Sequence, residues 1–317
     1  MSKTAIIFTG QGAQSPGMGK DVAAACPAAA EVFARANEVV GYDLRARCFE
    51  GPAEVLEQTD IQQPAIFTTS VAIWRATNDG RDLPERPVAM AGLSLGEYTA
   101  LYAAGSLTFE DALRLVKRRG ELMQAAAAAV PSGMVSVMGL DASRIENICH
   151  EAQVAGMIRP ANFNCPGQIV LSGTKQACAA VVPLIEKAGG RAVPLKVAGA
   201  FHSPIMQPAA EGLAKMLADT PIRPTQIRVI ANVNCQPHGE PDTIRKHLIA
   251  QLTSPVLWQG CIERMLGDGA ERFVEIGPGR ILTGLLKKIS RQTPVVNVST
   301  AEGVAAQKLK KELSRHL

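Results

Sequence analysis

The sequence has few of the features that mark membrane, metal-binding or nucleic-acid-binding proteins. No run approaches the roughly 20 apolar residues that a membrane-spanning helix needs, so we expect no membrane association. The seven cysteines are scattered, and no Cys-x-x-Cys pair or Cys/His cluster with zinc spacing occurs, which argues against a bound metal. With only eight Phe, three Tyr and two Trp, and no basic stripe interleaved with aromatic residues, we expect no nucleic-acid partner.

The bulk composition is that of a globular protein that can bury a sizeable core. The chain has 317 residues, 47% of them hydrophobic and 20% charged, which suits one large domain or two joined ones. The formal charge of +4 is mild and gives a weak preference for acidic partners. Residues 1–3 lead directly into a strand-like run with no signal-peptide pattern, so we expect a cytoplasmic protein. For the oligomeric state we take a monomer as the default.

The order of the expected elements indicates an α/β protein with a largely parallel sheet. Short β-branched runs alternate with longer helical patterns such as Pro27–Val40, Pro64–Asn78 and Phe109 to about Ala128. The expected strands of this sheet are Thr4–Thr9, Val88–Leu93, Arg228–Val233, Phe273–Ile276 and Val295–Val298.

The middle of the chain follows a different pattern. Its expected elements run in the order strand, helix, strand, strand, helix, strand, which is the ferredoxin-like βαββαβ arrangement. We therefore predict a small subdomain at 131–197 inserted into a larger α/β subdomain made of 1–130 and 198–317. The expected elements are Gly133–Leu140, Ala142–Ala155, Met157–Asn162, Gln168–Ser172, Lys175–Ala188 and Ala192–Val197.

A Gly-x-Ser-x-Gly motif at Gly92–Gly96 lies between an expected strand and an expected helix. In this context a sharp turn exposes the serine hydroxyl, and the two glycines leave room for the crowded backbone. Ser94 is therefore the candidate nucleophile. The amide of Leu95 would lie at a helix N-terminus, where unpaired N–H groups favour an oxyanion. The pattern also arises by chance, and the flanking strand and helix favour the functional interpretation.

A serine nucleophile needs a base, and five histidines are available. His316 lies at the C-terminus, His150 and His247 lie among charged residues, and His238 lies in a loop. His202 follows the last strand of the predicted small subdomain, at the border where a cleft is expected. An apolar context more often indicates a core histidine, but this location favours His202. No acidic residue is placed to orient its ring, so a dyad using a backbone carbonyl is as plausible as a triad.

Arg119 lies on the apolar side of its expected helix. At about 100° per residue it falls close to Ala112 and Val116, whereas the other charged residues of this helix spread over the opposite side. The guanidinium either extends outward to solvent or is buried against an anion. Because no acidic residue of the chain is an evident partner, a buried Arg119 would bind a substrate carboxylate bidentately.

Two glycine-rich loops follow expected strands. Thr9–Gln14 fits neither phosphate-binding pattern, and we interpret it as a tight loop that brings a backbone amide, such as that of Gln11, toward the serine turn. The second loop, Glu275–Gly279, is most simply a strand-to-helix turn.

Taken together, these motifs resemble the malonyl-CoA:acyl-carrier-protein transacylase family, over a span from Thr4 to about Leu286. They occur in the family's order: Phe8–Gln14, Gly92–Tyr98, Arg119-Gly120, Asn162–Gln168, Gly199–Ser203 and Glu275–Gly279.

The resemblance implies an α/β-hydrolase-like core with an inserted ferredoxin-like subdomain. It implies Ser94 as nucleophile, His202 as base and Arg119 as the acyl-carboxylate ligand. The backbone amides of Gln11 and Leu95 would form the oxyanion hole.

The family further implies that a backbone carbonyl, near Leu257, orients the histidine. Its substrates are malonyl-CoA and holo acyl carrier protein, with no cofactor, and Gly199–Ser203 has the form associated with malonyl selection. Two positions depart from the family pattern: Leu93 replaces a frequent histidine, and Thr9 replaces a usual proline. The first leaves acyl selectivity open.

Three alternatives to a malonyltransferase of fatty acid synthesis remain at this stage. A serine thioesterase or hydrolase would use the same nucleophile with water as acceptor. A degenerate homologue would serve as a scaffold, against which the intact Ser94, His202 and Arg119 argue. A stand-alone acyltransferase for polyketide synthesis would carry the same residues.

Overall fold

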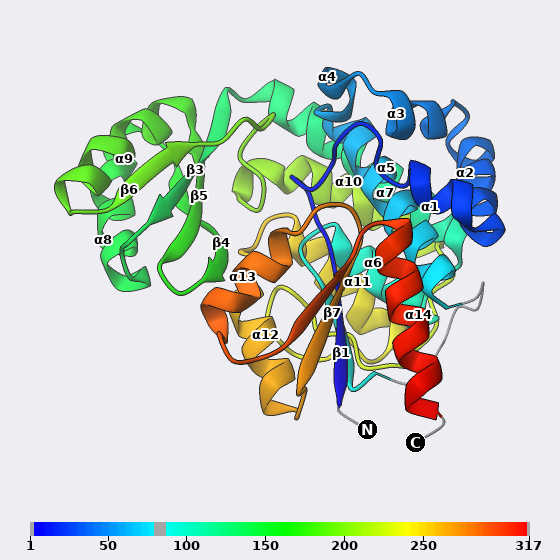
Figure 1. Ribbon diagram of the computed structural model, residues 1–317. Helices are drawn as coiled ribbons and strands as arrows, with labels where there is room; N and C mark the ends of the chain where they lie inside the picture. The colour runs from blue at the N-terminus through cyan, green and yellow to red at the C-terminus, as the bar shows by residue number, and fades with distance from the viewer. Residues whose placement is uncertain (1–2, 79–86, 316–317) are drawn as a thin grey trace.

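Two four-stranded sheets organise the chain in the computed structural model, which describes residues 3–78 and 87–315. One sheet is entirely parallel, with strand order β2-β1-β7-β8. The other is antiparallel, with order β4-β5-β3-β6. Figure 1 shows the antiparallel sheet and its helices, in green, to one side of the parallel sheet. The mixed α/β class predicted from the sequence is confirmed.

The parallel sheet gathers strands from both ends of the described chain. Its strands are β1 (Thr4–Phe8), β2 (Ala89–Gly92), β7 (Arg272–Ile276) and β8 (Val295–Val298). Side chains alternate along β1, so that Ala5 and Ile7 pack into one apolar cluster while Ile6 and Phe8 pack into another. Both faces of the sheet are therefore buried, as expected of a parallel sheet covered by helices.

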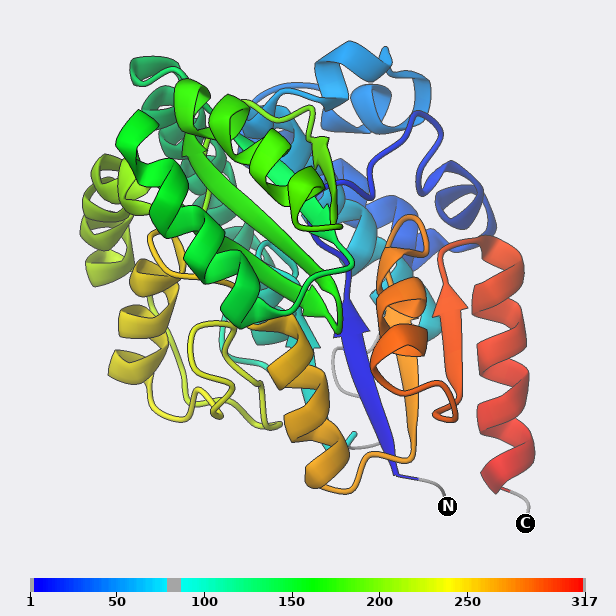
Figure 2. The ribbon, with the colours of Figure 1, turned by 90° about the vertical axis from the view of Figure 1, so that its left-hand side faces the viewer.

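Helices cover both faces of this sheet: α12 and α13 pack in one of its apolar clusters, and α5 and α14 pack in the other. Figure 2 shows α14, in red, beside β8 and α12, in gold, to the left of β1. None of the helices in the described ranges is long and apolar enough to cross a membrane. They are α1 (Lys20–Ala25), α2 (Pro27–Val40), α3 (Leu44–Glu50), α4 (Ala53–Leu56), α5 (Thr59–Thr77), α6 (Gly96–Ala103), α7 (Phe109–Ala129), α10 (Gln207–Asp219), α11 (Pro241–Gln251), α12 (Trp258–Gly267), α13 (Ile281–Ile289) and α14 (Ala301–Arg315), with a short 3₁₀ turn, η2 (Pro204–Met206), before α10.

The second sheet and its two helices form the predicted βαββαβ sequence of elements. α8 and α9 pack on one face of the sheet around their own apolar cluster, which includes Val135, Ile145 and Val181. The elements are β3 (Ser132–Met138), α8 (Ala142–Ala152), the 3₁₀ turn η1 (Gln153–Ala155), β4 (Ile158–Cys165), β5 (Gln168–Thr174), α9 (Lys175–Lys187) and β6 (Arg191–Pro194).

One expected strand is wrong. Arg228–Val233 forms only isolated bridges, in which Met90 donates to the carbonyl of Arg228 at 2.8 Å and Ile230 donates to that of Met90 at 2.9 Å. The extended run stops because the chain turns at Asn232, whose backbone amide donates to Glu97 Oε2 and whose carbonyl accepts the amide of Leu257 instead of continuing a ladder. α5 also begins at Thr59, five residues before the expected Pro64, so that Pro64 lies inside the helix, where it has no amide to donate to the carbonyl of Asp60.

Candidate active site

The turn between β2 and α6 holds Ser94 in a left-handed backbone conformation, with φ = 50°. The glycines on either side are required by close backbone contacts. A Cβ at Gly92 would lie 1.9 Å from the carbonyl carbon of Gly96, and a Cβ at Gly96 would lie 2.3 Å from the carbonyl oxygen of Phe8. The predicted strand–serine–helix turn is therefore present, and it presses α6 directly onto β1.

His202 reaches Ser94 from the segment between β6 and α10. Its Nε2 lies 2.8 Å from Ser94 Oγ, and both residues are less than 9% exposed. His202 also has a positive φ, 58°, which for a non-glycine residue is uncommon and clusters at functional sites. The backbone before it is tied to the small sheet, because Ser172 on β5 donates to the carbonyl of Phe201 at 2.5 Å.

The carbonyl that orients the histidine belongs to Gln251, and the expectation of Leu257 is wrong. His202 Nδ1 lies 2.7 Å from the Gln251 oxygen. Gln251 is the last residue of α11, where carbonyls have no partner within the helix and are free to accept. The Leu257 carbonyl instead accepts the amide of Cys261 at the start of α12. Because a carbonyl only accepts, Nδ1 carries the proton and Nε2 is free to accept from the Ser94 hydroxyl.

The surroundings of His202 keep its ring neutral. Burial, and then the positive charge of Arg119, lower the pKa of His202 from 6.5 to about 4, while the bond to the Gln251 carbonyl acts in the opposite direction. At neutral pH the ring is therefore a competent proton acceptor for Ser94.

Arg119 is buried at 1% exposure, so the alternative in which it extends to solvent is excluded. Its Nη2 donates to Ser94 Oγ at 3.0 Å and to Gln251 Oε1 at 2.9 Å, and its Nη1 donates to Gln63 Oε1 at 2.8 Å. The face of Tyr98 lies 5.6 Å from its guanidinium carbon. These direct partners are neutral, so a positive charge is held beside the Ser94 hydroxyl without a directly bonded anion.

A cavity of about 190 Å³ opens over this pair, between the two groups of elements. Gln11 lines it together with Ser94 and His202, and the loop that carries Gln11 lies against the serine turn, since a Cβ at Gly10 would lie 2.2 Å from the Leu93 oxygen. Leu95 occupies the N-cap position of α6, where its amide has no helical acceptor. The strands β3, β4 and β5 supply the opposite wall, with residues Met134, Asn162, Asn164, Gln168 and Val170.

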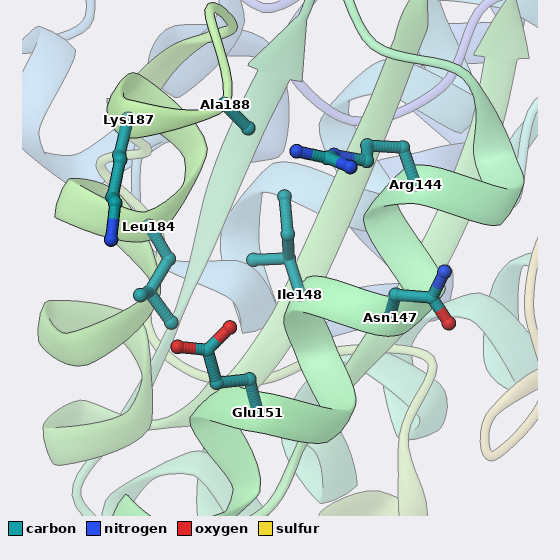
Figure 3. A pocket seen from close by; sticks show the side chains of 7 residues that line it. All are labelled: Arg144, Asn147, Ile148, Glu151, Leu184, Lys187 and Ala188. Carbon is teal, nitrogen blue, oxygen red and sulfur yellow. The ribbon is translucent and has the colours of Figure 1, made fainter.

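A second cavity, of about 310 Å³, lies between α8 and α9 and carries no comparable group. Figure 3 shows Ile148 and Leu184 there, with the charged side chains of Arg144, Glu151 and Lys187 around them. Within the described residues, no group of three or more His, Cys, Asp or Glu side chains is placed to hold a metal ion. Of these two cavities, only the serine cleft is lined by a candidate nucleophile and a candidate base.

Comparison with known proteins identifies the family of this chain. The family model for the acyl transferase domain matches residues 5–315. The malonyl CoA-acyl carrier protein transacylase of Bacillus subtilis is 41% identical over 316 residues, covering 98% of this chain and 99% of that protein. The chain belongs to the malonyl-CoA:acyl-carrier-protein transacylase family. It is therefore an acyltransferase.

Solved structures of the transacylase family share the whole fold. The malonyl CoA-acyl carrier protein transacylase of Coxiella burnetii superposes with a TM-score of 0.94 at 37% identity, with 98% of each chain covered. A malonyl-transacylase solved in complex with a type II PKS acyl-carrier protein gives a TM-score of 0.93 at 39% identity, covering 98% of this chain and all of that one.

Several polar residues of the site were missed in the sequence. Gln63 and Gln251 hold Arg119, and Asn232 Oδ1 accepts the amide of Ser94 at 2.7 Å. Glu97, at 0% exposure, joins Asn232 to Gln251. The sequence does distinguish Glu97, because it is the one charged residue of α6. Nothing in the local sequence distinguishes the two glutamines and the asparagine.

Proposed function

We propose that the chain transfers a malonyl group from malonyl-CoA to the phosphopantetheine thiol of acyl carrier protein, supplying malonyl-ACP for fatty acid synthesis. The observation that carries this proposal is the position of Arg119, a buried cation 3.0 Å from Ser94 Oγ with neutral partners. A free carboxylate on the acyl group is the complement that such a cation lacks. The names of the related proteins, which act on malonyl-CoA and acyl carrier protein, support the same substrates.

In the first half-reaction, Ser94 Oγ attacks the thioester carbonyl while His202 Nε2 takes the hydroxyl proton. The negative charge that develops on the carbonyl oxygen is stabilised by the backbone amides of Gln11 and Leu95. The C–S bond then breaks, His202 returns the proton to the departing sulfur, and coenzyme A leaves a malonyl-Ser94 ester.

In the second half-reaction, the phosphopantetheine thiol of acyl carrier protein takes the place of coenzyme A. His202 removes the thiol proton as sulfur attacks the ester, and it returns that proton to Ser94 Oγ as the acyl–oxygen bond breaks. The same groups therefore act in both half-reactions of a ping-pong mechanism. The reaction as proposed uses these side chains and the two substrates alone, without a cofactor.

Arg119 has a selective role in this scheme. In the free site its Nη2 is shared between Ser94 Oγ and Gln251 Oε1, and Gln63 holds Nη1. The malonyl carboxylate can displace the weaker neutral acceptors and bind the guanidinium in a charge-assisted pair. The acyl group is thereby oriented with its thioester carbon near Ser94.

We further propose the architecture that the resemblance implied, with residues 131–197 as a ferredoxin-like subdomain and residues 1–130 and 198–317 as an α/β-hydrolase-like one. The strand order β4-β5-β3-β6 and the separate apolar cluster of the small sheet support the first part. The serine turn at the end of a parallel strand supports the second.

The similarity to a malonyl-transacylase solved with a polyketide acyl-carrier protein supports a second candidate function, that of an acyltransferase for a polyketide acyl carrier protein. The chemistry at Ser94 would be identical, and the acceptor protein alone would differ. Comparing the rates of discharge to acyl carrier proteins of both classes separates the two functions.

Intact-protein mass spectrometry after brief incubation with malonyl-CoA tests the proposed reaction. We expect a malonyl-sized adduct on the wild type, none on Ser94→Ala, and discharge of the adduct by holo acyl carrier protein. Steady release of coenzyme A without any acceptor, and without an adduct, would show a hydrolase instead.

A further inference from the structure

A buried carboxylate lies behind the serine turn and takes no part in the proposed reaction. Glu97, three residues after Ser94, is completely buried, and both of its oxygens are engaged. Oε1 accepts a bond from His238 Nε2 at 2.7 Å. Oε2 accepts the backbone amide of Asn232 at 3.0 Å and the side-chain amide of Gln251 at 2.8 Å. Burying a carboxylate is costly unless donors of this kind surround it, and here each oxygen has at least one donor.

The two residues that Glu97 holds are the ones that hold the reacting groups. Besides orienting His202, Gln251 donates to the carbonyl of Ser94 at 3.0 Å and accepts from Arg119. Asn232 uses its side chain in both directions: Oδ1 accepts the amide of Ser94 at 2.7 Å, and Nδ2 donates to the carbonyl of Gly92 at 2.9 Å. One carboxylate therefore binds the side chain of Gln251 and the backbone amide of Asn232, the two residues that contact the serine turn, the histidine and the arginine.

The bonds on the outer side of Glu97 have one consistent direction. Asn234 Oδ1 accepts the amide of Gln236 at 3.0 Å, so Asn234 Nδ2 faces His247 Nε2, 3.1 Å away, and donates to it. The proton of a neutral His247 must then lie on Nδ1, which is 3.4 Å from His238 Nδ1. His238 accepts there and donates through Nε2 to Glu97.

The neutral state of the His247 ring agrees with its surroundings. Burial, and then the proximity of His238, lower the pKa of His247 from its usual value, whereas Glu97 acts to raise it. The chain of donors reaches solvent at Asn234, which is exposed.

We propose that Glu97 is a positioning residue of the acyl-transfer centre and that His238 holds its carboxylate in place. Glu97 touches neither substrate nor the reacting atoms; it acts through Gln251 and Asn232. This inference rests on the proposed function, because the quantity it affects is the rate of acyl transfer through Ser94.

The test measures the rate constant for malonylation of Ser94 at saturating malonyl-CoA, by rapid quench and mass spectrometry. Each rate is expressed per chain that takes up label on long incubation, so that misfolded protein does not count. Melting temperatures are recorded in parallel. The variants are His238→Leu, which removes the donor to Glu97, His238→Gln, which replaces it with an amide N–H, and Glu97→Gln. His150→Leu, at an exposed position on α8, is the matched control.

We expect His238→Leu and Glu97→Gln each to lower the rate about tenfold to a hundredfold, the range in which displaced catalytic groups lose activity. His238→Gln should restore most of the rate lost in His238→Leu, and His150→Leu should match the wild type. Because Glu97 and His238 act in series, the double variant Glu97→Gln/His238→Leu should lose no more than either single variant.

A purely structural role predicts a different pattern. If both variants melt earlier but label at the wild-type rate per active chain, the inference is overturned while the proposed function stands. If the wild type itself forms no malonyl adduct, the proposed function fails and this inference with it. Should His238→Leu not fold, the isosteric Glu97→Gln decides alone.

Discussion

In the proposed function, a single residue, Arg119, carries substrate choice. The guanidinium is buried with the neutral acceptors Gln63, Gln251 and Ser94. A hydrogen bond to a charged partner contributes about 1.5–3 kcal/mol, more than a neutral acceptor offers. We therefore expect the free energy that favours a malonyl over an acetyl group to come mainly from this one contact, which the acetyl group cannot make.

Replacement of Arg119 by alanine should collapse this preference. We expect kcat/KM for malonyl-CoA to fall about tenfold to a hundredfold, the equivalent of one charge-assisted bond, while acetyl-CoA gains relative ground. The measurement is kcat/KM for both thioesters. Arg118→Ala is the matched control, since Arg118 makes a half-exposed pair with Glu121 and should change neither value. An unchanged malonyl preference in Arg119→Ala would remove this role.

The depressed pKa of His202 predicts how activity depends on pH. Because the folded pKa is about 4, the ring stays neutral from pH 8 down to about pH 5, and the malonylation rate should lose its base only as pH falls through 4. The unfolded chain binds this proton near pH 6.5, so the unfolded state is favoured increasingly as pH drops from 6.5 to 4.

Two measurements separate these effects. Rapid-quench malonylation in short pH jumps reports the base, and equilibrium unfolding of wild type and His202→Gln reports the linkage. An acid limb of the malonylation rate near pH 6.5 would show that burial does not depress this pKa. His202→Gln should lose less stability than the wild type between pH 6.5 and 4, because glutamine does not titrate.

At the scale of elements, the contact between α6 and β1 fixes the serine turn. A Cβ at Gly96 would overlap the carbonyl oxygens of Phe8 and Thr9, at 2.3 and 2.8 Å, and backbone cannot move aside easily. Gly284, on α13, is the natural comparison, since a Cβ there meets no atom within 4 Å.

Alanine at these two positions should therefore have opposite effects. We expect Gly96→Ala to lower the free energy of unfolding by about 1–3 kcal/mol or more, as overpacking does, and to abolish malonylation. Gly284→Ala should raise it by up to about 1 kcal/mol, because alanine is the better helix former. Chemical denaturation of the two variants checks both values, and a Gly96→Ala protein as stable as the wild type would contradict the close contact.

The sequence predicts those residues of the site that differ from their local surroundings. Ser94, His202 and Arg119 were identified because each stands out from its own surroundings: a motif, a position at a border, a charge on an apolar face. Gln251 does not stand out, because its role comes from its backbone carbonyl at the end of α11. The position of a helix end relative to another segment is set by tertiary packing, which local sequence does not show. The same reasoning explains the expected strand Arg228–Val233, whose β-branched pattern was overridden by the tertiary hydrogen bonds of the Asn232 backbone.

For the molecule as a whole, the small sheet is part of the active site as well as a neighbour of it. It lines one wall of the cleft, and Ser172 on β5 fixes the backbone just before His202. A second tie, from the amide of Ala200 to Ser132 Oγ at 3.1 Å, joins the same segment to β3. The orientation of His202 therefore depends on the position of the small sheet relative to the parallel sheet and its helices.

Loss of the Ser172 hydroxyl should reduce turnover. In Ser172→Ala the Phe201 carbonyl loses its partner, and we expect kcat to fall about tenfold through looser placement of His202, with a smaller change in KM for malonyl-CoA. Ser136, on β3 of the same sheet, provides the control, and Ser136→Ala should keep the wild-type kcat. Steady-state kinetics with holo acyl carrier protein as acceptor gives both constants; equal kcat values for the two variants would refute the coupling.

The backbone at Ser94 and His202 has a consequence for the evolution of this chain. Both residues adopt dihedral angles that glycine tolerates best, and each such residue costs of the order of 1–3 kcal/mol. A domain of ordinary stability has only about 5–15 kcal/mol in total, so the reacting pair consumes a noticeable share of it. We expect that selection for stability alone would relax these two positions, at the expense of the geometry that brings Ser94 and His202 together.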